Sequence, residues 1–181
     1  MSQWANFAGY QFVWFAAVCG ASRGLTWPAL LAMAFFAAWQ LRVSQSRTAD
    51  LRLSGIALLM GVLLDGTLNA SGLLHYTARS MELPAGGAPL WILALWVAFA
   101  LTFNHSLSWV TGRTLLSLSL GAVGGPLAYL GAGRLGAVSF AAPAWRGLLG
   151  LAAGWGLACA LLGSLARAWR GRAWDAGTAS P

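Results

Sequence analysis

An otherwise apolar run, GVLLDGTLNASGLLHY at residues 61–76, carries an acid, an amide and an imidazole. Gly61, Asp65 and Asn69 follow one another at four-residue steps, and Gly72 and Tyr76 continue the series. On an α-helix such positions share one side, so the spacing predicts a small, polar side that faces protein or water. A charge at the centre of a bilayer costs about 3 kcal/mol. We therefore expect Asp65 to be neutral, paired or in a wet cavity.

An acid inside a membrane is a candidate for binding a proton or a substrate, and the alternative is a hydrogen-bonded structural role. Counting about 1.5 Å per residue along the expected helices places Thr102 and Pro126 near the depth of Asp65. We expect a protonated Asp65 to donate to a hydroxyl, or to the backbone carbonyl that Pro126 leaves free. The candidate intramembrane polar site comprises Asp65, Asn69, Thr102, His105 and Tyr129.

The two histidines do not suggest a metal site. His75 and His105 fall on the order of 20 Å apart along the membrane normal, so they cannot share an ion. The sequence contains no HExxH, CxxC or GxSxG motif and no second carboxylate near the expected depth of Asp65. We expect neither a metal nor a cofactor. The residues give no basis for assigning a catalytic group, and His105 in TFNHSLSW is typical of a hydrogen bond between membrane helices.

The composition indicates the environment of these polar groups. Hydrophobic residues make up 59% of the 181 residues and charged residues only 8%, against about 25% charged residues in soluble domains. A chain of this kind uses lipid as its solvent and satisfies its backbone in helices. All eleven basic residues are arginines scattered between apolar runs. They form no basic face, which excludes nucleic acid as a partner and favours membrane lipids.

Six apolar stretches separated by short polar segments predict an all-α, polytopic membrane protein with about six transmembrane helices in three hairpins. A single transmembrane domain over residues 1–166 would precede a cytoplasmic tail over 167–181, interfacial or disordered. The stretches are 4–22, 26–41, 52–74, 89–110, 114–133 and 145–166.

Arginine placement predicts that both termini are cytoplasmic, because seven arginines then lie inside and four outside. Proline and tryptophan open the second, fourth and sixth stretches, in TWPALL, APLWIL and APAWRG. Proline suits the first helical turn and tryptophan the headgroup layer, so these three helices would begin at the same, outer face.

Small residues predict where the helices touch. Gly121 and Gly125 in the fifth stretch, and Gly150 and Gly154 in the sixth, have GxxxG spacing. Such spacing allows close packing, either of these two helices or between copies of the chain, so the oligomeric state stays open. Gly124, Gly125 and Pro126 together predict a helix kink.

Four segments resemble a family of small bacterial polytopic inner-membrane proteins that is known only as a domain of unknown function. They are NFAGYQFVWF, LLDGTLNASGLL, PLWILALWVAFALTFNHSLSW and GAVGGPLAYLGAGRLGA, and the resemblance spans about residues 4–165. It implies a multi-pass protein of the bacterial inner membrane and transfers no catalytic residue. Similar proteins are often encoded beside lipid-modifying enzymes, which implies membrane lipids, and possible lipid-modifying enzymes, as partners.

Three functional classes remain. The scarcity of acid–base groups favours a non-catalytic accessory in a membrane-lipid or envelope-stress pathway. A small proton-coupled transporter or permease subunit would use Asp65, and a water-accessible cavity reaching that residue would favour it. A membrane-embedded lipid-modifying enzyme would use Asp65 or His105, and a lateral, lipid-sized groove ending at either residue would favour it.

Overall fold

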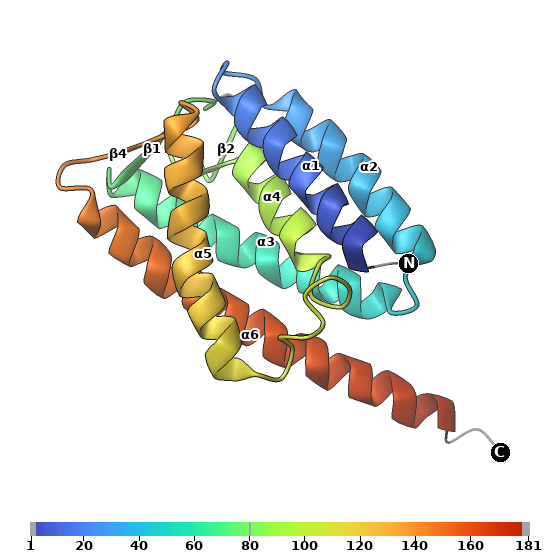
Figure 1. Ribbon diagram of the computed structural model, residues 1–181. Coiled ribbons are helices and arrows are strands. Elements are labelled where there is room, and N and C mark those ends of the chain that lie inside the picture. The colour runs from blue at the N-terminus through green and yellow to red at the C-terminus, as the bar shows by residue number, and fades with distance from the viewer. Residues whose placement is uncertain (1–2, 80, 179–181) are drawn as a thin grey trace.

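The computed structural model describes residues 3–79 and 81–178, with side chains through Arg170. Six helices dominate these residues (Figure 1): α1 (Gln3–Ala21), α2 (Trp27–Val43), α3 (Arg47–Ala70), α4 (Leu90–Ala100), α5 (Thr114–Arg134) and α6 (Trp145–Thr178). The predominantly helical architecture agrees with the prediction. α6 runs through the predicted domain boundary at residue 166, and residues 179–181 of the predicted tail lie outside the described residues.

Three of the described helices are long and apolar enough to cross a membrane: α3, α5 and the Trp145–Arg170 part of α6. Their sequences lack a charged face, and leucines such as Leu63, Leu127 and Leu157 are more than half exposed on them. Exposed leucine is stable where acyl chains replace water.

The fourth apolar stretch departs from the prediction. A helix over 89–110 is wrong for the second half of that range, because α4 ends at Ala100 and residues 101–112 form successive turns. With 11 residues, α4 is about 16 Å long, too short for a hydrocarbon core of about 30 Å. Thr102, Asn104 and Ser106 interrupt the apolar pattern at this point, and their side chains bond to backbone or to other polar groups.

Helix α4 is the centre of the fold. Nine of its 11 residues are buried, from Trp91 to Ala100. It packs against α1, α2 and α3, while α5 packs along α6 and α6 also contacts α3. Figure 1 shows α1 and α2 side by side on one flank, with α5 crossing in front of α3.

Two short antiparallel sheets were not foreseen by an all-α prediction. β1 (Leu74–Tyr76) pairs with β4 (Val138–Phe140), and β2 (Glu82–Leu83) pairs with β3 (Ala88–Pro89). The chain reaches β1 through Gly72, whose φ of +70° favours glycine. The prediction that Gly72 and Tyr76 continue the helical side of Asp65 is therefore wrong, since α3 stops at Ala70.

The predicted small residues pack within one chain. Gly121 lies against the Trp155 backbone, and a Cβ at Gly125 would come within 2.5 Å of the Trp155 ring. Gly150 and Gly154 face α3 instead of α5, at Leu68 and Leu64. Helix α5 continues through Pro126.

Candidate functional site

Asp65 is held by aromatic side chains from three other elements. The Tyr76 hydroxyl of β1 donates to Oδ1 at 2.6 Å, and the Trp96 indole of α4 donates to Oδ2 at 2.6 Å. The Tyr129 hydroxyl of α5 also bonds to Oδ1. Asp65 has no exposed surface. We call Asp65, Tyr76, Trp96 and Tyr129 the Asp65 cluster.

The Asp65 cluster contains no cation. Neither of the two ion pairs found among the described residues involves Asp65. An indole N–H can only donate, so Oδ2 acts as an acceptor whatever the protonation state of Oδ1. The absence of a paired cation and the hydroxyl partners agree with the prediction. The partner itself was predicted wrongly, because the Thr102 hydroxyl donates to the Phe99 carbonyl.

The packing of α3 on α4 positions the Asp65 cluster. Gly61, one turn before Asp65, leaves room for the Trp96 ring, since a Cβ there would lie 2.5 Å from it. The Trp96 ring stacks on the Trp155 ring of α6, with centroids 4.1 Å apart and planes inclined by 15°. Two rigid contacts therefore fix the indole that donates to Asp65.

Asn69, one turn beyond Asp65, supports the loop between β2 and β3. Its amide donates to the carbonyls of Gly87 at 2.8 Å and Gly86 at 3.2 Å. In the same loop the Arg79 guanidinium, hydrogen-bonded to Glu82, lowers the pKa of that carboxyl below its ordinary value. Asn69 therefore has a structural role here and does not contact Asp65 through any of these bonds.

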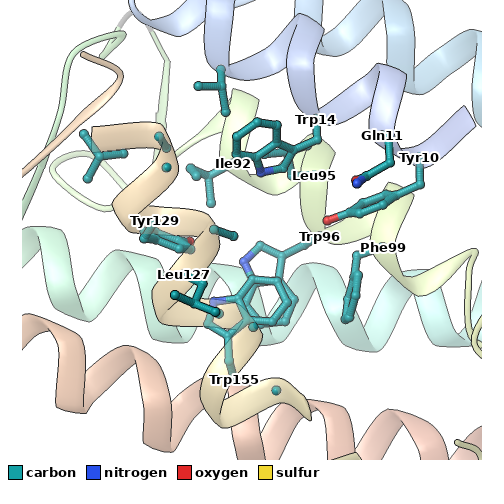
Figure 2. Close-up of a pocket in the computed structure, with 18 of the residues that line it drawn as sticks. Tyr10, Gln11, Trp14, Ile92, Leu95, Trp96, Phe99, Leu127, Tyr129 and Trp155 are labelled. Carbon is teal, nitrogen blue, oxygen red and sulfur yellow. The ribbon is translucent and has the colours of Figure 1, made fainter. Parts of the chain in front are cut away.

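A cavity of about 430 Å³ lies beside the Asp65 cluster. Residues of α1, α4, α5 and α6 line it, and Tyr129 and Trp96 belong to its wall. In Figure 2, Tyr10 and Trp14 of α1 and Tyr129 of α5 point toward the space around Trp96. The volume falls within the range of about 300–1,000 Å³ typical of ligand pockets. The lining is aromatic and aliphatic, with Gln11 and the two tyrosines as polar additions.

Two buried donors in the cavity wall have no hydrogen-bond partner. They are the indole N–H groups of Trp91 and Trp155, whose side chains are 0% and 9% exposed as residues. The Trp155 N–H lies toward Tyr129 without the geometry of a hydrogen bond. An unpaired buried donor costs about 1–3 kcal/mol. A ligand with an acceptor atom would recover part of that cost.

The rim of the cavity is apolar and exposed. Phe15 of α1 and Leu127 of α5 line it and are 55% and 61% exposed. Gly124 also lines it, and a Cβ added there would meet nothing within 4 Å. On a helix that faces lipid, such a rim leaves the cavity open toward acyl chains.

A second buried acid, Asp50, was not among the predicted site residues. Asp50 is fully buried and bonds to Ser44, to the Asn104 amide at 2.8 Å and to His105 Nε2 at 3.1 Å. We call Asp50, Ser44, Asn104 and His105 the Asp50 cluster. The sequence placed Asp50 in a connecting segment, although its position shortly after Ser46, in the first turn of α3, is a usual place for an acid.

A neighbouring set of amides also holds the turns after α4. The Asn6 amide donates to Gln40 at 2.8 Å and to the Leu101 carbonyl at 3.2 Å, and its oxygen accepts from Ser106. Together with the Asp50 cluster, these bonds fix residues 101–112 against α1, α2 and α3. His105 thus serves this segment, while His75 is exposed in β1.

The described residues contain no group of three His, Cys, Asp or Glu side chains that could hold a metal ion. The only acid–base pair found among them, His105 with Asp50, does not line the cavity. The Asp65 cluster and its cavity are therefore arranged for binding, with both carboxyl oxygens already engaged.

Comparison with known proteins gives one informative result. No curated protein and no solved structure matches the chain. A family described as "Protein of unknown function (DUF2878)" matches residues 3–161, which include the whole Asp65 cluster, the Asp50 cluster and the cavity. On this match over most of its length, the chain belongs to the DUF2878 family.

Proposed function

We propose that this protein is a multi-pass membrane protein that binds a lipid-like molecule in the cavity beside Asp65. It would act as a non-catalytic accessory in a membrane-lipid pathway of the bacterial inner membrane. The observation that carries the proposal is the aromatic cavity of about 430 Å³ with an exposed apolar rim on α1 and α5.

A lateral opening near Asp65 is also what a lipid-modifying enzyme would need. Acid–base catalysis requires a group within hydrogen-bond reach of the substrate. Asp65 does not line the cavity, and three donors from aromatic side chains occupy its two oxygens. Binding without catalysis is therefore the better-supported role.

The proposed orientation has both termini in the cytoplasm and three helical hairpins. Contacts across the chain support it. The Thr77 hydroxyl donates to the Gly136 carbonyl at 2.7 Å, joining two of the segments expected outside. Gln3 donates to Ser108 at 3.4 Å and Arg170 bonds to Thr111, joining segments expected inside.

The test is lipid retention by the purified protein. Mass spectrometry of lipids that co-purify in a mild detergent should find a bound species in the wild type. Gly124→Leu places a side chain in open space at the cavity rim and should remove that species. Gly55→Leu is the matched control, because Gly55 also has open space around it but does not line the cavity. Equal retention by the two variants would refute a ligand in this cavity.

A second candidate is a small proton-coupled transporter. The observation in its favour is the interruption of the fourth apolar stretch at Ala100, since discontinuous helices often form transporter sites. Transport requires Asp65 to meet water in one conformation. A water-soluble carbodiimide with an amine nucleophile should then label Asp65 in proteoliposomes, detected by mass spectrometry, whereas Asp65→Asn gives the background. Labelling no higher than that background would exclude this candidate.

A further inference from the structure

The neutral donors of the cavity wall restrict the chemistry of its ligand, and this step rests on the proposed function. No arginine or histidine is among the residues that line the cavity. Both oxygens of Asp65 are occupied by the Asp65 cluster. The unpaired polar atoms of the wall are the indole N–H groups of Trp91 and Trp155. Such a wall suits an uncharged ligand that carries a hydrogen-bond acceptor.

The Trp155 indole is held rigidly. Its ring stacks on Trp96, and Gly121 and Gly125 of α5 lie directly against it. Its N–H lies toward Tyr129. An acceptor bonded to Trp155 would therefore sit in a fixed place, and flat aromatic faces would surround it. A planar ligand ring fits these faces better than a flexible chain does.

The depth of Trp155 narrows the ligand further. Trp155 is ten residues after Trp145, where α6 begins, which places it about 15 Å below that end of the helix. This is the middle of a hydrocarbon core about 30 Å thick. The ester carbonyls of a normally seated phospholipid lie near the headgroups and do not reach this depth. A carbonyl at mid-membrane belongs to a lipid whose polar group is itself small and neutral.

We infer that the cavity binds a membrane quinone: a planar ring with carbonyl acceptors, one of them bonded to Trp155 Nε1, on an apolar polyprenyl tail that leaves between Phe15 and Leu127. The inference concerns binding, and no electron transfer is part of it. The aromatic walls stack on the ring, and the apolar rim accommodates the tail.

The first test uses the wild-type protein and two probes. One is a benzoquinone with a decyl tail, and the other is the decyl arene in which methyl groups replace the two carbonyl oxygens. Binding to the detergent-purified protein is measured by isothermal titration calorimetry. We expect the quinone to bind at least tenfold more tightly than the arene. Equal affinities would overturn the role of the carbonyl acceptor.

The second test uses variants with the quinone probe. Trp155→Phe should weaken binding about fivefold, as expected for the loss of one hydrogen bond. Trp145→Phe, an exposed residue on the same helix that does not line the cavity, should leave it unchanged. If Trp91→Phe weakens binding and Trp155→Phe does not, the assignment to Trp155 is wrong.

The outcomes separate this inference from the proposed function. If Gly124→Leu abolishes retention of a diacyl lipid while the quinone probe does not bind, the lipid-binding function stands and the quinone is excluded. If neither the retained lipid nor the quinone probe depends on Gly124, both proposals fail.

Discussion

Asp65 and Asp50 lie on the same helix and are both fully buried, yet their surroundings differ. Asp65 is bonded by two phenols and an indole that belong to β1, α4 and α5. Asp50 is bonded by a serine, an asparagine and a histidine, of which the last two belong to the turns after α4. The aromatic partners of Asp65 have a second face that lines a cavity, whereas those of Asp50 stabilise a non-helical segment.

The comparison teaches that burial alone does not identify a functional acid in a membrane protein. What distinguishes Asp65 is that Tyr129 and Trp96 connect it to a space able to hold a ligand. Asp50 has the more reactive partner, a histidine, but no such space. The following predictions, from the largest expected effect to the smallest, test this difference.

Removing each acid should give the largest contrast. Asp65→Ala leaves three buried donors unpaired, each costing about 1–3 kcal/mol, so we expect a loss of roughly 3 kcal/mol or more in unfolding free energy. Asp50→Ala should cost about 1–2 kcal/mol, because Asn104 and His105 are partly exposed and can reach water. Reversible unfolding in mixed micelles measures both.

Asp65→Asn is the matched control for the first contrast. Its amide oxygen can still accept from Trp96, so we expect a loss under about 1 kcal/mol. An Asp50→Ala variant less stable than Asp65→Ala would contradict the comparison.

Helix packing beside Asp65 gives the second contrast. Gly61→Ala forces a methyl group against Trp96 and should cost about 1–3 kcal/mol, as overpacking does. Gly55→Ala on the same helix meets open space and should stabilise by about 0.5–1 kcal/mol through helix propensity. If thermal unfolding shows the same sign for the two variants, Trp96 is not held as described.

Removing one partner from each acid gives a smaller contrast. Tyr129→Phe should cost about 1 kcal/mol, and Asn104→Ala about half of that because water can replace its amide. Tyr10→Phe is the control, since Tyr10 lines the cavity but is no part of the Asp65 cluster. Denaturant titration of the three variants would refute the contrast if Tyr10→Phe were the most damaging.

The exposed pair of Arg79 and Glu82 should give the smallest effect, and a pH-dependent one. The pKa of Glu82 is lower in the folded protein than in the unfolded chain, where it is about 4.3. Its contribution is therefore complete above that value and is lost as pH falls through the lowered pKa. The melting temperature of Glu82→Gln should fall slightly below wild type at about pH 7 and equal it at about pH 2. A constant difference across this range would contradict the ion pair.

Much of the helical fold could be predicted from apolar run length. The stretches that became α1, α2, α3 and α5 agree with the helices to within a few residues, except at the two ends of α3. The end of α4 could not be placed, because Leu101 and Phe103 continue the apolar run and only hydrogen bonds to distant residues stabilise the turns. The strand pair β1–β4 joins residues more than sixty positions apart, so no local pattern predicts it.

The candidate site was predicted in part for the same reason. Four-residue spacing places Gly61, Asp65 and Asn69 on the buried side of α3, and the structure confirms this burial. The partners of Asp65 come from a return of the chain through Gly72 and from two other helices. Aromatic residues are frequent in this sequence, so their identity as partners carries no sequence signal.

The most direct test of the account is a structure of the protein in lipid nanodiscs at a resolution that shows bound lipids. We predict elongated density in the cavity between α1 and α5, with its polar end about 3 Å from Trp155 Nε1. A cavity closed by the packing of α1 on α5, or one filled only by water, would contradict it.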